Sequence, residues 1–352
     1  MKKIWLSLVI VTISCAPTIK KFDAYQKAPM LKANLMPSKE VVEGRPVKVA
    51  IFPLETDGLL VAKNTKLGSS IAIDIESLLT KDKLVELIDR KASQKLEKEV
   101  ELAEMKSNKT YEGPVVADYI ISGSINKANF TSQYISAKHS FNIESGSYSY
   151  VPPKWNYISE VGGNIKIYAI PSLSIVRTFE IDGTSKMSEN AKSKTSAKTE
   201  DDYLVKEASR NALNNISIDL KNYFAKKGYI LEKKVLKGQT IFKISLGTKD
   251  GMKQGQKLII YSKKEERNSI TGEVEIIESK ITKAVVADII NAKSSWIIIK
   301  NKNDIEKIRL GDIVKAEYKK SFWQSKRENT KDVGVVAVGI LGIMGNTSSV
   351  AF

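Results

Sequence analysis

The 352-residue chain has only one cysteine and one histidine, and this scarcity removes several classes of chemistry. A single cysteine cannot form a disulfide within the chain, and one residue of each type cannot build a Cys/His zinc set or a histidine-based catalytic triad. The glycine-containing stretch 251–257 lacks the spacing of a phosphate-binding loop, and no acidic pair points to a hydrolytic site. We therefore expect a protein that is not an enzyme and uses no metal or cofactor.

The sequence also lacks a long hydrophobic run near its start. Residues 4–13 form a short apolar stretch behind Lys2 and Lys3, well below the length of about 20 residues that a transmembrane helix needs. A positive start followed by a short apolar run is typical of a secretory signal peptide. Ile13-Ser14-Cys15 then resembles a bacterial lipobox, in which the thiol receives a diacylglycerol and the chain is cut before it. We expect a lipoprotein signal peptide over 1–15 and lipidation of Cys15, palmitate included; the alternative is a stray thiol in an ordinary signal sequence.

Acidic residues are fewer than basic ones, with 40 Asp and Glu against 56 Lys and Arg and a net charge of +16. Cleavage before Cys15 would remove Lys2 and Lys3 and leave +14. The basic residues are spread along the chain, which is typical of a solvated surface and also suits anionic lipid head groups or cell-wall polymers. Export argues against nucleic acid as a partner.

The region after the signal peptide divides by pattern. Residues 16–45 contain Pro17, Pro29 and Pro37 without an apolar period, so we expect a tether. Residues 46–228 alternate strand-like and helix-like segments, which predicts an α/β (α+β) domain with a mixed sheet and packed helices. The predicted strands are 47–54, 84–88, 119–125, 165–170 and 175–181, and the predicted helices are 67–79, one after Asp89, and 202–227 with Gly228 as its terminating residue.

Residues 229–318 are short, β-branched segments separated in several places by glycine turns, which predicts a small all-β barrel or sandwich. The expected strands are 240–246, 257–261, 274–277, 282–290, 296–300 and 312–316. Residues 319–352 form a tail with a Gly-rich apolar stretch at 333–345. This stretch is too short for a standard transmembrane helix. Gly339 and Gly342 are therefore candidates for contact with a membrane or another subunit, the alternative being packing on the chain's own domain.

Four features of the chain form a recognisable set: the lipobox, Ile51-Phe52-Pro53, the VELIDR stretch at 85–90 and the ADYIISGSI strand at 117–125. With these features, residues 47–224 resemble the curli assembly and transport component family, the CsgG-type outer-membrane lipoproteins. The resemblance implies an α/β fold and a lipid-anchored protein at the periplasmic face of the outer membrane. None of the matching residues is catalytic.

The small β region contains Ile244-Ser245-Leu246-Gly247, 250–255 (DGMKQG) and 310–314 (LGDIV). With these stretches it resembles the C-terminal domain of the flagellar-assembly protein T group. The glycines suit tight turns that need positive φ angles. In that group the domain is a binding or structural module, so the resemblance implies no chemistry.

Channel-forming members of the first family contribute two amphipathic hairpins per subunit to a shared β-barrel. Residues 130–168 alternate apolar and polar side chains as such a hairpin would, and Trp155 and Tyr157 are candidates for membrane or oligomer contact; a half-buried soluble hairpin shows the same pattern. Residues 184–202 have almost no apolar side chains. Burying their lysines against lipid would cost about 2–4 kcal/mol each near the bilayer midplane, so a soluble loop is favoured there.

We therefore expect an assembly or scaffold component of a secretion, curli-like fibre or motor-associated complex, held to the outer membrane by its lipid. Its partners would be the membrane, other envelope proteins and further copies of itself. One alternative is an oligomeric outer-membrane secretion channel for curli-like subunits. Another is a periplasmic regulator of a cell-wall synthase.

Cys15→Ala tests the lipobox. The change removes the nucleophilic sulfur that would carry the lipid, so we expect loss of fatty-acid labelling and release from the membrane fraction. Ser14→Ala is the matched control, because it keeps a small residue before the cysteine and should label like the wild type. Metabolic labelling with a fatty-acid analogue and fractionation measure both; unchanged labelling of Cys15→Ala would contradict the lipobox.

Overall fold

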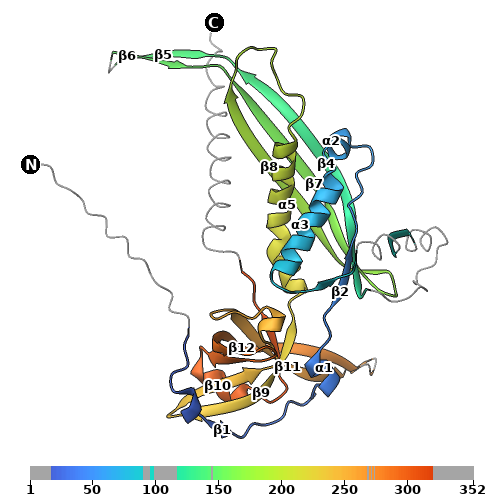
Figure 1. Cartoon of the computed structure of the whole chain (residues 1–352), viewed down its shortest axis with the longest axis vertical. Coiled ribbons are helices and arrows are strands. Elements are labelled where there is room, and N and C mark those ends of the chain that lie inside the picture. The colour runs from blue at the N-terminus through green and yellow to red at the C-terminus, as the bar shows by residue number, and fades with distance from the viewer. Residues whose placement is uncertain are drawn as a thin grey trace, which may run out of the picture. The chain divides into compact units, whose positions relative to one another are not determined.

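The computed structural model describes residues 17–89, 96–98, 117–143, 146–267, 269–270, 272 and 274–319. These residues form a mixed α+β structure that contains one mixed sheet, one closed antiparallel barrel and one two-stranded ribbon (Figure 1). The sheet uses strands from before residue 191, whereas the barrel strands follow residue 226.

The mixed sheet has five strands in the order β3-β2-β4-β7-β8. Their bounds are β2 Lys48–Ile51, β3 Glu86–Leu87, β4 Tyr119–Ile135, β7 Lys154–Ala169 and β8 Ser174–Asn190. β2 runs parallel to β3 and β4, whereas β4, β7 and β8 are antiparallel. The predicted strands are present, and β4, β7 and β8 extend well beyond the predicted lengths.

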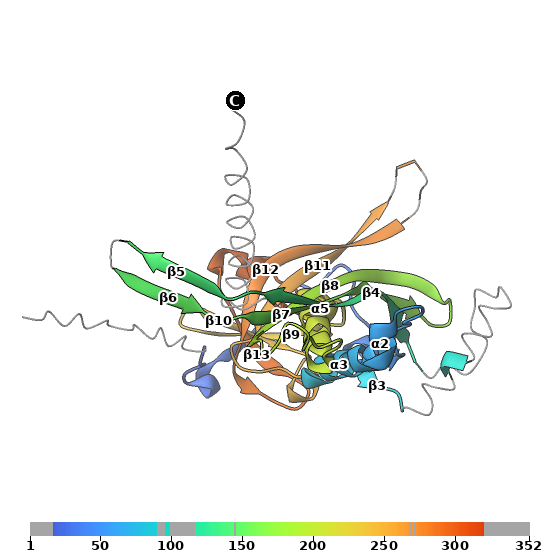
Figure 2. The ribbon, with the colours of Figure 1, turned by 90° about the horizontal axis from the view of Figure 1, so that it is seen from above.

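Helices α2 (Leu60–Asn64), α3 (Leu67–Lys81) and α5 (Asp202–Tyr223) lie on one face of this sheet (Figure 1 and Figure 2). Asp201 caps α5, because its carboxylate accepts a hydrogen bond from the Leu204 amide at 3.0 Å. α5 approaches β8 so closely that a Cβ on Gly183 would lie 2.3 Å from the Ala208 carbonyl oxygen. Among the described residues, no helix is both long enough and apolar enough to cross a bilayer.

The prediction that α5 ends at Gly228 is wrong. The helix ends at Tyr223 with Phe224 as its C-cap, and Gly228 lies within strand β9 (Lys227–Leu236). A Cβ on Gly228 would lie 2.4 Å from the Leu246 side chain, so this glycine permits close packing inside the barrel instead of ending a helix.

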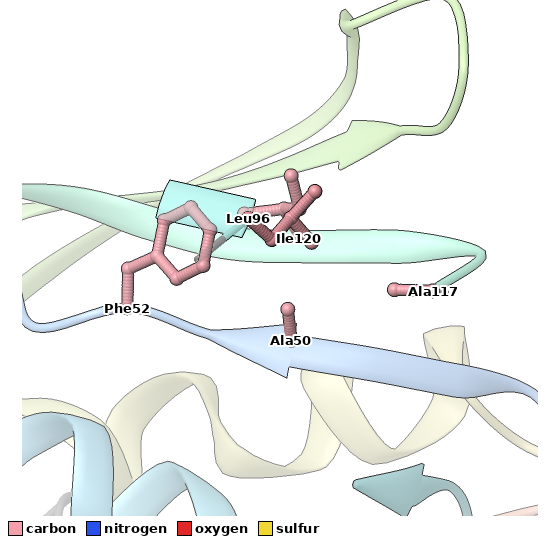
Figure 3. Packing of buried hydrophobic residues seen from close by; sticks show 5 residues of the cluster. All are labelled: Ala50, Phe52, Leu96, Ala117 and Ile120. Carbon is pink, nitrogen blue, oxygen red and sulfur yellow. The ribbon is translucent and has the colours of Figure 1, made fainter. Parts of the chain in front are cut away.

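The opposite face of the sheet is covered by a second apolar cluster (Figure 3). Leu96 lies in the helical residues 96–98 and packs with the buried residues Ala50, Phe52, Ala117 and Ile120. Since strand side chains alternate between faces, burial of both Ala50 and Ile51 shows that β2 is covered on both sides. The remainder of the helix predicted after Asp89 lies outside the described residues.

The barrel closes six antiparallel strands in the order β9-β10-β13-β12-β11-β14, with β14 pairing back to β9. After β9, its strands are β10 Gln239–Ile244, β11 Lys257–Arg267, β12 Val274–Ile290, β13 Ser295–Ile299 and β14 Ile313–Ala316. The predicted strands 274–277 and 282–290 are one continuous strand, β12. The barrel agrees with the expected all-β region and closes through the pairing of Ile313 with Tyr229.

The described part of the predicted tether packs on this barrel. Residues 17–45 contain the short helix η1 (Phe22–Ala24), strand β1 (Gln26–Ala28) and helix α1 (Lys39–Glu43). β1 pairs with β9, and Ile19 and Tyr25 are buried in a cluster with Trp296. The expectation of a tether is therefore wrong for residues 17–28, because Ile19, Phe22 and Tyr25 pack against the barrel and β1 pairs with β9.

Asp312 is a charged residue buried in the barrel directly before β14. Its side chain is only 2% exposed, and one oxygen, Oδ2, accepts a hydrogen bond from the Arg309 amide at 2.7 Å. The other oxygen has no partner within the described part of the chain. Burial outweighs the Arg309 contact and raises the pKa of the Asp312 carboxyl to about 6.

Asp312→Asn should therefore change how stability depends on pH. An unfolded aspartate has a pKa near 4, so the folded wild type binds the proton more tightly, and its stability falls as pH rises from about 4 to about 6. The neutral amide avoids this loss. The difference in unfolding free energy, variant minus wild type, should therefore increase by about 2–3 kcal/mol as the pH rises from about 4 to about 7. Urea unfolding at both pH values measures this, and parallel pH curves for the two proteins would contradict it.

Candidate functional site

The β4–β7 hairpin continues into an arm of two strands that pair only with each other. β5 (Lys138–Asn142) and β6 (Ser147–Val151) form this ribbon, named here the β5–β6 arm (Figure 2). Pro152-Pro153 separates β6 from β7. Proline has no amide hydrogen to donate to a ladder, which explains why the long hairpin is interrupted at this point.

One face of the β5–β6 arm is aromatic. The register pairs His139 with Tyr150 and Phe141 with Tyr148, and the paired ring centroids are 4.8 and 4.6 Å apart. Because side chains alternate along a strand, Ser140 and Ser149 lie on the opposite face. Tyr148 is 84% exposed and Phe141 is 50% exposed, so the aromatic face is presented to its surroundings.

This exposure indicates an interaction surface. A lone two-stranded hairpin is marginally stable in water, and clustered exposed apolar side chains commonly mark contact sites. Each arm strand has five residues, which is shorter than the 9–11 residues of a membrane-crossing strand.

Trp155 and Tyr157, the predicted contact residues, lie at the base of the arm and face inward. They are 7% and 0% exposed, and the loop 191–200 covers them. The indole nitrogen of Trp155 donates to the Ser193 carbonyl at 3.1 Å, and the Lys198 amide donates to the Tyr157 hydroxyl at 3.4 Å. Contact of either residue with a membrane or another subunit stays a prediction, and it would require this loop to move.

Lys198 fixes the covering loop by several interactions. Its ammonium group lies 3.1 Å from Glu189 and 3.4 Å from Asp201, and 5.2 Å from the centre of the Tyr157 ring. The hydrogen bond that the Lys198 ammonium donates to Glu189 raises the pKa of Lys198, and burial raises the pKa of the Tyr157 phenol. The lysine is thus charged and the phenol neutral at neutral pH. The segment 184–202 is only partly the loop that was expected, since 184–190 continue strand β8.

A polar cavity of about 590 Å³ lies where β4 bulges between Ile125 and Lys127. Amide and carboxylate groups dominate its lining: Asn126, Lys127, Gly162, Gly163, Asn164, Glu180, Ile181, Asp182 and Asn215. The lining contains three charged side chains, Lys127, Glu180 and Asp182. Among the described residues, no group of His, Cys, Asp and Glu side chains is placed to hold a metal ion. The β5–β6 arm is therefore the stronger candidate site.

Sequence reasoning found the hairpin but missed the aromatic residues of its second arm strand. Tyr148 and Tyr150 alternate with serines in the stretch SYSYV at 147–151, a period of two that would have identified them. Their pairing with Phe141 and His139 depends on the hairpin register. Cys15, Gly339 and Gly342 lie outside the described residues, so their predicted roles stay predictions.

Comparison with known proteins gives a distant structural likeness. No family model matches the chain, and no curated protein matches it. Among solved structures, a PelC dodecamer from Paraburkholderia phytofirmans is similar at 14% sequence identity and a TM-score of 0.24. The match covers 55% of this chain and 93% of that chain. A likeness at this TM-score carries no argument about function.

Trp155→Ala and Tyr150→Ala should separate the covered base of the hairpin from the exposed arm. Truncating the buried indole leaves a cavity and removes the Ser193 contact, so we expect a loss of about 3–5 kcal/mol in unfolding free energy. Tyr150 is 58% exposed, and its truncation should change stability by less than about 0.5 kcal/mol. Denaturant unfolding measures both variants; equal losses would show that the arm is covered in the isolated protein.

Proposed function

We propose that this protein is a lipid-anchored assembly or scaffold component of the cell envelope, at the periplasmic face of the outer membrane. The observation that carries the proposal is the β5–β6 arm, which projects an aromatic face without a covering element among the described residues. The lipobox around Cys15 supports the membrane attachment. The complex that it would serve is a secretion, curli-like fibre or motor-associated assembly.

A second copy of the chain is the partner that the arm fits best. Among the described residues, β5 and β6 pair only with each other, so each has one edge of backbone amides and carbonyls without a neighbouring described strand. Such edges readily add a further strand. An identical arm would bring a matching edge and a matching aromatic face, and both Phe141 and Tyr148 would then be covered.

A secretion channel is the second candidate function, because the long β4–β7–β8 ribbon has the hairpin order that such a channel uses. In the described conformation, however, the apolar face of this ribbon at Trp155 and Tyr157 is occupied by the chain's own loop. Forming a channel would need that loop to leave and the arm strands to lengthen. A regulator of a cell-wall synthase would instead use the arm of a monomer to bind another protein.

The paired change Phe141→Ser with Tyr148→Ser tests the arm. Removing the two rings eliminates apolar area that self-association would bury, so we expect the particle in mild detergent to shift from oligomer to monomer. Ser140→Ala with Ser149→Ala changes the opposite face and should leave the particle size unaltered. Light scattering and negative-stain imaging of the full-length protein measure the mass.

Two results would contradict the proposal in different ways. A wild-type oligomer that survives loss of both rings would show that another surface holds it together. A monomeric wild type would exclude self-association and favour the synthase-regulator function, in which case crosslinking from the arm would identify a different protein. Wild-type rings with the loop 191–200 displaced would favour the channel.

A further inference from the structure

We infer that the barrel rests directly on the membrane, with residues 17–28 forming a basic strip that contacts anionic phospholipid head groups. We call residues 17–28 the N-terminal strip. The inference rests on the proposed lipid at Cys15. It adds the orientation of the barrel on the membrane and a preference of the strip for anionic lipids. It replaces the expected long tether by a contact between protein and membrane.

The connection between the lipid and the barrel is short. Only Ala16 separates Cys15 from Pro17. The Pro17 carbonyl accepts a hydrogen bond from the Gln254 side chain at 3.2 Å, and the Ile19 amide donates to an Asp288 carboxylate oxygen at 2.8 Å. Four residues of extended chain span at most about 14 Å. The barrel surface at Ile19 must therefore lie within about that distance of the lipidated residue.

The N-terminal strip is held on the barrel along its whole length. Ile19 and Tyr25 are 7% and 6% exposed, and the Tyr25 hydroxyl donates to Gln239 at 2.7 Å. The Phe22 ring packs edge to face on Trp296 with centroids 5.1 Å apart. β1 pairs antiparallel with β9, with Lys27 opposite Lys234. A strip fixed by burial, hydrogen bonds and a strand ladder cannot act as a flexible stalk.

The exposed side chains of the strip and its border are mainly cationic. Lys20, Lys21 and Lys27 are exposed, as is Lys237 in the β9–β10 turn next to the Tyr25 contact. Asp23 is exposed within the strip, and Asp288 borders it. A cluster with excess lysine held within a Debye length of anionic lipid is attracted to the surface. The charge therefore favours phosphatidylglycerol-type head groups over neutral ones.

The test uses full-length lipidated protein in vesicles of phosphatidylcholine alone or with phosphatidylglycerol. Asp23→Cys supplies the only free thiol, because Cys15 is lipidated, and carries a donor dye; the lipid head groups carry an acceptor. We expect strong energy transfer in both vesicle types. A long Gly/Ser linker inserted between Ala16 and Pro17 should reduce transfer in phosphatidylcholine but not with phosphatidylglycerol, where the strip itself still binds.

Lys20→Gln with Lys21→Gln completes the design. In the linker-bearing protein, these changes should lower energy transfer in phosphatidylglycerol vesicles to the level seen in phosphatidylcholine. Weak energy transfer in the protein without the linker would contradict the proposed orientation, in which the barrel rests on the membrane. Equal loss of transfer in both vesicle types after linker insertion would overturn head-group recognition.

Failure of the lipid anchor is distinguishable from failure of the strip. The intact mass of the purified protein reports whether Cys15 carries a lipid. Sedimentation, with each vesicle type, of protein made without residues 1–15, which carries neither lipid nor signal peptide, then reports on the strip alone. We expect binding to phosphatidylglycerol vesicles that weakens about fivefold for each lysine replaced, and equal binding to both vesicle types would contradict the strip.

Discussion

The antiparallel pairing of β4 with β7 is the interaction on which the rest of the α+β region depends. The ladder runs from Tyr119 opposite Ala169 to Ile135 opposite Lys154. A bulge between Ile125 and Lys127 shifts the register by one residue. Up to Ile125, the odd-numbered residues of β4 face the helices; after the bulge, the even-numbered residues do. This keeps an apolar face under α5 and the loop 191–200 along the whole ribbon.

The same ladder explains why one end of the hairpin is covered and the other is not. Where β8 and the loop 191–200 accompany the hairpin, Trp155 and Tyr157 are buried. Beyond Pro152-Pro153, the part of the chain that the structure describes provides no third strand. The aromatic face of the arm therefore packs against no described core. The exposed aromatic face is thus a direct result of where the third strand ends.

The two proposed contacts differ in kind. The N-terminal strip is fixed on the barrel by Ile19, Phe22 and Tyr25 and carries exposed lysines. The β5–β6 arm presents aromatic rings, and in the described part of the chain no further strand pairs with it. Charge suits the first to a lipid surface, and aromatic area with open strand edges suits the second to a protein. The proposed scaffold function would use both kinds of contact.

The sequence by itself determined the elements whose signals are local. The period of two in 119–125, the helical stripe of 67–79 and the turn glycines of 229–318 each predicted the element that the structure contains, since neighbouring residues alone produce these patterns. Only the tertiary structure decided what covers each element. Trp155 and Tyr157 alternate as membrane-facing residues would, but a loop from far along the chain covers them. Pro-rich 17–45 has no period, yet three apolar side chains dock on strands more than 200 residues away. Burial is set by contacts between distant segments, and these contacts leave no local pattern to read.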